Sequence, residues 1–166
     1  MSQKRKGGRT TPAARALPLV LATDPVLHGV AMTAEPSEML FQLGQRMIAT
    51  AWKYNGMAVA APQVGADVRL VALHTGLVVL NPTIHDTSGQ QIGDEGCLTY
   101  PDRWWRVPRA FKVYVTGVDV RDGKAIGTWA DAVDARMWQH EIDHLDGLVL
   151  VNRFDEVTEE HNAARR

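Results

Sequence analysis

The chain has 166 residues, of which 45% are hydrophobic and 22% are charged, and its formal net charge is -1 at pH 7. This length and composition predict one globular domain and argue against a disordered or fibrous chain. No apolar run approaches the roughly 18 residues that a membrane-spanning helix needs, so we expect a soluble protein with no membrane partner.

The start of the chain differs in charge from the rest. It contains no acid and five basic residues, which are Lys4, Arg5, Lys6, Arg9 and Arg15. Such a segment is typical of a solvated extension, although it could also direct a protein to an organelle or contact nucleic acid. We therefore expect a disordered basic extension over residues 1–16, a single domain over residues 17–154 and a short polar tail over residues 155–166. No specific nucleic-acid partner is expected.

After an irregular approach segment over residues 17–34, the first regular element is a helix. Ser37 follows a proline and is placed to cap the first turn. Apolar residues then recur at three- and four-residue spacing, which predicts one buried stripe along a helix of about four turns. The stripe consists of Leu40, Leu43, Met47, Ile48 and Ala51. The Asn55-Gly56 pair tolerates positive φ, so the helix should end there.

The middle of the chain predicts strands. Residues 68–74 and 77–81 are apolar runs on either side of a Thr75-Gly76 turn. Residues 112–120 carry valines at alternating positions, as a half-buried strand does. An Asp-Gly pair then predicts a tight hairpin turn into a further strand over residues 124–129.

A second helix is predicted over residues 131–146, because Gly147 lies where a helix normally ends. A short closing strand is predicted over residues 148–151. Together these elements predict an α+β fold in which mixed or antiparallel sheets surround a central helix.

The second helix contains the run His140-Glu141-Ile142-Asp143-His144. Histidines four residues apart lie on the same helix face, so both imidazoles can bind one metal ion. Glu141 lies close enough to handle the proton of an attacking water, as in other hydrolases with an H-E-x-x-H motif. The alternative is a pair of ordinary helix histidines, and the apolar residues on both sides of the run argue against it.

A catalytic site of this kind needs a third protein ligand and an open position for water. Downstream, Leu150 stands where one protease class has a third histidine, and the remaining glutamates lie in the polar tail. Upstream lies Cys97, the only cysteine, which excludes an intramolecular disulfide and fits a reducing compartment. A lone cysteine is usually an inert buried residue. A histidine pair that lacks a third ligand favours Cys97 as that ligand.

Three segments together resemble the peptide deformylase family. They are residues 56–63 (GMAVAAPQ), residues 95–99 (EGCLT) and residues 139–147 (QHEIDHLDG), in the order and at spacings that the family shows. The resemblance extends from about residue 24 to residue 154. It implies a catalytic domain that hydrolyses the N-formyl group of N-formylmethionyl nascent peptides and releases formate.

The resemblance implies one divalent metal ion per chain, with Cys97, His140 and His144 as its ligands. Fe(II) is expected as the native ion, and Zn, Ni or Co could replace it. Glu141 is implied as the general base that later returns its proton to the departing amine.

The resemblance also implies donors for the developing oxyanion. These are the side-chain amide of Gln63 and the backbone N–H of Leu98. The expected substrate-binding residues are Gly56, Met57, Ala58, Val59, Gly96, Arg136 and Met137. The first four would form a rim along which the peptide adds as a strand, and the last two would line a pocket for its methionine side chain. Arg136 departs from the family, in which this position is usually apolar.

Many bacterial members of the family continue into a long C-terminal helix implicated in ribosome docking. Residues 155–166 are too short and too polar for such a helix, so we expect at most transient proximity to the ribosome. A cytoplasmic location is expected, and the basic N-terminal segment makes an organelle the alternative.

Two other functions fit parts of the pattern. One is a different metal hydrolase that acts on another small acyl-amine or on peptides. The other is a non-catalytic metal-binding protein. Gln63 and Glu141 argue against the latter, because a structural metal site requires neither and favours four protein ligands.

Overall fold

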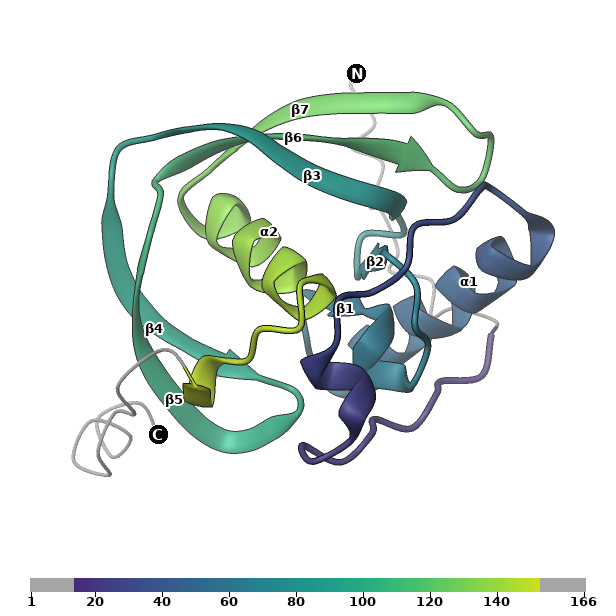
Figure 1. Ribbon diagram of the computed structural model, residues 1–166, viewed down its shortest axis with the longest axis horizontal. Helices are drawn as coiled ribbons and strands as arrows, with labels where there is room; N and C mark the ends of the chain where they lie inside the picture. The colour runs from purple at the N-terminus through teal and green to yellow at the C-terminus, as the bar shows by residue number, and fades with distance from the viewer. Residues whose placement is uncertain (1–13, 153–166) are drawn as a thin grey trace, which may run out of the picture.

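The computed structural model describes residues 14–152. One helix, α2 (Ala132–Leu145), lies at the centre of the fold, with strands on either side of it (Figure 1). Most of the predicted N-terminal extension and all of the predicted tail lie outside the described residues. The elements in chain order are η1 (Pro25–His28), α1 (Glu38–Lys53), β1 (Ala58–Ala60), η2 (Ala61–Val64), β2 (Leu70–Leu73), β3 (Val78–Ser88), β4 (Gln91–Cys97), β5 (Tyr100–Arg109), β6 (Lys112–Asp119), β7 (Ala125–Asp131), α2 (Ala132–Leu145) and η3 (Leu150–Asn152).

The described strands form two antiparallel sheets around α2. The larger sheet has the order β1-β2-β3-β6-β7, and the smaller sheet pairs β4 with β5. Figure 1 shows β3, β6 and β7 passing over one side of α2, while β4 and β5 curve round its other side. α1 packs against β1 and β2. The predicted α+β class, with antiparallel sheets around a central helix, is confirmed.

The features predicted for α1 are confirmed. Ser37 caps the helix, because its Oγ accepts a hydrogen bond of 3.3 Å from the backbone N–H of Leu40. The predicted stripe is buried except for Leu43, which is partly buried against the same core. Asn55 adopts a φ of +56°, as expected where the chain leaves the helix. The stripe therefore fixes α1 on the outer side of β1 and β2.

The structure corrects the sequence prediction in two places. Residues 148–151 do not form a strand; η3 begins at Leu150, and Val149 and Leu150 are buried beside Leu27 and Cys97. β4 and β5 were not predicted, because β4 contains two glycines and two acids and lacks an alternating apolar pattern. These two strands are held by pairing with each other and by ion pairs to α2, which local sequence does not show.

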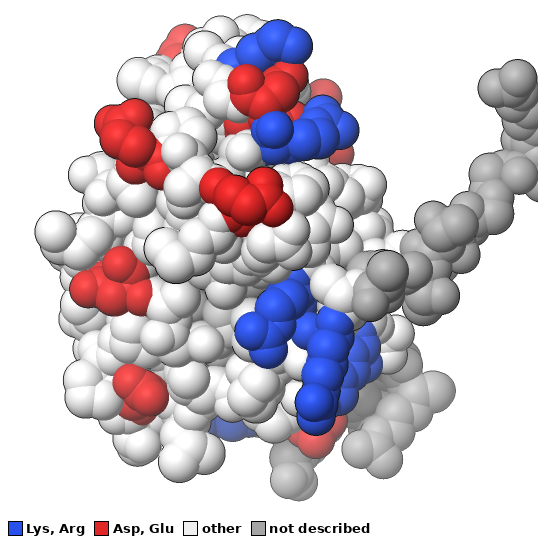
Figure 2. All heavy atoms as spheres, turned by 90° about the vertical axis from the view of Figure 1, so that its right-hand side faces the viewer, with Lys and Arg blue, Asp and Glu red and all other residues white. Residues whose placement is uncertain are grey.

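Neither α1 nor α2 has the length and hydrophobicity of a bilayer-spanning helix, and the same holds for the other described helices. The face that carries α1 has both kinds of charge (Figure 2). Its basic side chains gather in two separate groups, with acidic and uncharged surface between them.

The end of α2 depends on a glycine, and this gives a test of the fold. Gly147 has a φ of +73°, and a Cβ there would lie 2.8 Å from the carbonyl oxygen of Gly29. Gly123 has a similar φ of +70° but no neighbour within 4 Å. Gly123→Ala should lower the free energy of unfolding by roughly 1–2 kcal/mol, the cost of a left-handed conformation for alanine. Gly147→Ala should cost about 2 kcal/mol more, because the backbone must also move.

Urea unfolding followed by circular dichroism measures both free energies. Equal losses for the two variants would show that α2 does not lie as close to Gly29 as the structure places it.

Candidate metal centre

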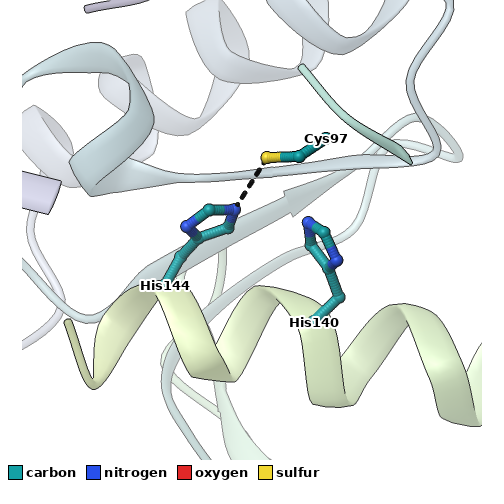
Figure 3. Close-up of side chains that lie close together, drawn as sticks. All are labelled: Cys97, His140 and His144. Carbon is teal, nitrogen blue, oxygen red and sulfur yellow. Dashed lines mark hydrogen bonds between the residues drawn. The ribbon is translucent and has the colours of Figure 1, made fainter. Parts of the chain in front are cut away.

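Cys97, His140 and His144 converge on one point. Cys97 is the last residue of β4, and the two histidines lie on successive turns of α2. One ligand atom from each residue lies within 4.8 Å of those of the other two. Figure 3 shows both imidazoles directed from α2 toward the sulfur, and Cys97 Sγ lies 3.2 Å from His144 Nε2. The convergence that the sequence interpretation required is therefore present.

An irregularity in the smaller sheet places the cysteine. The register shifts between Gly96 and Cys97, so that Gly96 lies opposite Trp104 while Cys97 lies opposite Tyr100. A Cβ at Gly96 would contact the Trp104 ring at 3.4 Å, so the indole packs directly over the glycine. The thiol is 7% exposed and lies on the inner side of the sheet, where it faces α2.

The three side chains change one another's ionisation. Burial alone would raise the pKa of Cys97, but the charge of His144 and hydrogen bonds from His140 and His144 lower that pKa well below its ordinary value. Burial alone would lower the pKa of His140, but hydrogen bonds with Cys97 and Glu95 raise it well above its ordinary value. The pocket thus favours a thiolate facing positive charge. A metal cation can supply that charge in place of the imidazole protons.

The donor set fits a transition-metal ion such as Zn²⁺ or Fe(II). One thiolate and two imidazoles are ligands that these ions accept, and three ligands leave a coordination position open. Glu141, the neighbour of His140, is 5% exposed, and among the described residues its Oε2 has no hydrogen-bond partner. Burial raises the pKa of Glu141, and the charges of His140 and His144 oppose this only in part. A buried carboxylate oxygen of this kind is placed to accept a proton inside the site.

A second layer of charge holds His140. Its Nδ1 donates to Glu95 Oε2 at 3.0 Å, which leaves Nε2 for a metal ion. Arg109 binds both oxygens of Glu95 at 2.9 Å and also binds Asp143 Oδ2 at 2.6 Å. Glu95 is buried, yet its hydrogen bonds from His140 and Arg109 lower its pKa to about 2. It is therefore a carboxylate that fixes the imidazole tautomer.

The sequence interpretation did not assign a role to Glu95, Arg109 or Asp143. The sequence did contain a signal for two of them, because Glu95 lies in the segment around Cys97 and Asp143 lies between the two histidines. An acidic residue beside a buried ligand requires a cationic partner. The sequence alone could not indicate that Arg109 is that partner.

Gln63 also points into the site. Its Oε1 accepts from the backbone N–H of Ala60 at 2.9 Å, which fixes the orientation of the amide. Its Nε2 then faces Thr99 Oγ1 at 3.3 Å and Cys97 Sγ at 3.6 Å. Gln63 is 1% exposed. A buried amide donor is thus held beside the cysteine.

The residues predicted to contact a peptide backbone lie at one edge of the larger sheet. Gly56 and Met57 lead into β1, whose only pairing partner in that sheet is β2. Val59 is fully buried, so its predicted contact with a substrate stays a prediction. A Cβ at Gly56 would lie 2.8 Å from Leu98 Cδ1, so this edge passes close to the residue after the cysteine.

The two residues predicted to line a methionine pocket lie on α2. Met137 is partly buried against the core cluster that contains Trp138. Arg136 is partly buried as well, and its Nη1 donates to Glu95 Oε1 at 2.7 Å. Its pocket-lining role stays a prediction.

A cavity of about 770 Å³ lies against another side of α2, and none of the three candidate metal ligands lines it. Its walls include Arg69, Gln91, Arg109, Gln139 and Asp143. Each of these five side chains is paired with another side chain or with a backbone carbonyl. The cavity therefore does not compete with the cysteine–histidine cluster as the candidate reaction site.

Comparison with known proteins gives the same family at the levels of sequence and structure. The family model described as "Polypeptide deformylase" matches residues 16–160. A peptide deformylase from Halothermothrix orenii is 37% identical over 143 residues, covering 82% of this chain and 92% of that protein. One from Thermodesulfovibrio yellowstonii is 39% identical over 146 residues, covering 82% and 88%. The structure of a class I type b peptide deformylase from Acinetobacter baumannii, bound to Met-Ala-Ser, superposes with a TM-score of 0.78 at 31% identity, covering 84% of this chain and 99% of that one.

The buried ion pair beneath His140 should matter more to stability than an exposed one. Arg109 and Glu95 have side chains that are 5% and 4% exposed, whereas Arg121, paired with Asp119 at 3.0 Å, is 70% exposed. Arg109→Met should lower the free energy of unfolding by about 3 kcal/mol, because it leaves the buried Glu95 and the partly buried Asp143 without this partner. Arg121→Met should cost less than about 1 kcal/mol.

Denaturant titration of the two variants beside the parent protein measures this difference. An Arg109→Met variant as stable as Arg121→Met would contradict the ion-pair network.

Proposed function

The chain belongs to the peptide deformylase family, and from this we propose how its own residues carry out the reaction. Members of this family are hydrolases that remove the N-formyl group from N-formylmethionyl peptides by metal-dependent hydrolysis. We infer that Cys97, His140 and His144 hold the metal ion of this chain. The observation that carries this is their convergence within 4.8 Å around a thiol whose pKa is well below its ordinary value.

The metal ion, when bound, would act as a Lewis acid toward the formyl group and its attacking water. A thiolate and two imidazoles support Fe(II) as the native ion, with Zn, Ni or Co as substitutes. Oxidation of a thiolate ligand would inactivate such a site, so the iron form should be sensitive to oxygen.

Glu141 is proposed as the general base. Its buried carboxylate would accept a proton from the water as oxygen attacks the formyl carbon. The same proton would then pass to the amine nitrogen, so that the carbon–nitrogen bond breaks and formate leaves. The burial that raises the pKa of Glu141 supports this role, because a base of higher pKa holds the proton between the two transfers.

Two donors are proposed to stabilise the negative charge on the former carbonyl oxygen. One is the Gln63 side-chain amide, which the backbone of Ala60 holds in place. The other is the backbone N–H of Leu98, next to Cys97. Donors that are fixed before the reaction lower the barrier without having to reorganise during it.

The proposed substrate is the formylated end of a nascent chain. Its backbone would add as a strand along Gly56, Met57 and Ala58, since β1 is an edge strand of the larger sheet. Gly96 would form part of the same binding surface. The Met-Ala-Ser peptide in the Acinetobacter baumannii relative supports a peptide that begins with methionine. We place the reaction in the cytoplasm, where the protein would meet new chains near the ribosome.

The residue that distinguishes catalysis from metal binding is Glu141. Glu141→Ala should reduce formate release from an N-formyl-Met peptide by about 10²- to 10⁴-fold, the usual contribution of a general base. Its metal content should remain that of the parent, because Glu141 is not a ligand. Formate would be measured anaerobically, or with Ni- or Co-loaded protein. Glu35→Ala, at an exposed glutamate before α1, is the matched control and should retain full activity.

Full activity of Glu141→Ala would reject the proposed base. Faster turnover of N-acetyl-Met or unblocked peptides than of formyl-Met peptides would instead favour a hydrolase of different acyl specificity.

A further inference from the structure

Arg136 forms a link between α2 and the sheet that carries the cysteine. Its Nη1 donates to Glu95 Oε1 at 2.7 Å and to the backbone carbonyl of Val107 at 3.0 Å, and the carbonyl of Gly93 lies at 3.4 Å. These three partners lie on both strands of the smaller sheet. The Arg136 side chain is 13% exposed. It is therefore a partly buried cross-link between α2 and the smaller sheet.

The Arg136 and His140 side chains meet the same carboxylate. They lie four residues apart on α2, and Arg136 binds Glu95 Oε1 while His140 binds Glu95 Oε2. Arg109 approaches the two oxygens from β5, but it also binds Asp143. Each oxygen of Glu95 thus receives two donors. Without Arg136, Oε1 would keep only one of them, and the carboxylate could turn relative to the imidazole.

We propose that Arg136 is a positioning residue for the metal centre: it fixes the Glu95 carboxylate, and that carboxylate fixes the His140 imidazole that binds the metal. The inference rests on the proposed metal site. The ion pairs also support it, because Arg109 is shared between Glu95 and Asp143, whereas Arg136 pairs with Glu95.

The Arg136 guanidinium packs against Gly93. A Cβ at Gly93 would lie 3.1 Å from Arg136 Nη2 and 3.3 Å from Arg136 Cζ. The guanidinium thus fills the space where another residue would place its side chain. An alanine there must displace the guanidinium, so the position gives a second and milder way to disturb the same contact.

Zinc release tests the proposal without requiring catalysis. The zinc-loaded full chain is mixed with excess chromogenic chelator, and the rate of transfer is measured well below the unfolding temperature. Arg136→Met should release zinc faster than the parent, by up to the roughly tenfold to hundredfold that loss of the direct partner of a ligand causes. Arg69→Met is the matched control. Arg69 is 14% exposed and also forms a 2.7 Å ion pair with the end of α2, but its partner is Asp146. It should lose thermal stability and release zinc at the parental rate.

The second arm uses Gly93→Ala alone and combined with Arg136→Met. The alanine should speed zinc release in the parent and have no further effect once Arg136 is methionine, because both changes act on one contact. If Arg136→Met does not fold, Gly93→Ala alone still tests the contact, and it should release zinc faster than the parent.

Unchanged release from both Arg136→Met and Gly93→Ala would overturn the proposal, as would equal acceleration by Arg69→Met. Formate release by the parent is measured in parallel. A parent that holds zinc but releases no formate refutes the proposed function, while the release rates still decide the role of Arg136.

Discussion

The carboxylate of Glu95 links the strand that carries Cys97 to the helix that carries His140 and His144. It lies in β4, two residues before Cys97, and it accepts hydrogen bonds from His140 and Arg136 on α2 and from Arg109 on β5. A buried carboxylate without these donors would be strongly destabilising. The same interactions that stabilise Glu95 therefore also set the distance between the cysteine strand and the histidine helix, and with it the size of the proposed metal site.

The rest of the fold supports this arrangement from outside. The larger sheet passes over α2 and ends in β1, so the proposed peptide-binding edge lies near the residue after the cysteine. The turn at η2 brings Gln63 inward, and one backbone bond from Ala60 orients its amide. The proposed ligands, base and oxyanion donors thus come from β4, α2 and η2 and from Leu98 after β4, and hydrogen bonds from neighbouring groups orient His140 and Gln63. Such preorganisation is what electrostatic stabilisation of a transition state requires.

Local sequence was sufficient to predict features that depend on neighbouring residues alone, such as helix faces and helix caps. The spacing of His140 and His144 predicted their common helix face, and Ser37 predicted the start of α1 correctly. The choice of Cys97 needed the missing third ligand and the family resemblance, because more than 40 residues separate it from the histidines. β4 was missed because long-range ion pairs stabilise a segment with poor strand propensity. β5 was missed because Pro101 and Pro108 interrupt its run of strand-forming residues. The role of Arg136 could not be predicted, because its partners lie on two distant strands.

The central claim is that one sulfur and two imidazole nitrogens bind a single ion. X-ray absorption at the zinc edge of the zinc-loaded full chain tests it most directly. The account predicts one sulfur at about 2.3 Å and nitrogen or oxygen ligands at about 2.0–2.1 Å, with the sulfur contribution absent in Cys97→Ser. A spectrum of nitrogen and oxygen ligands alone in the parent protein would contradict it.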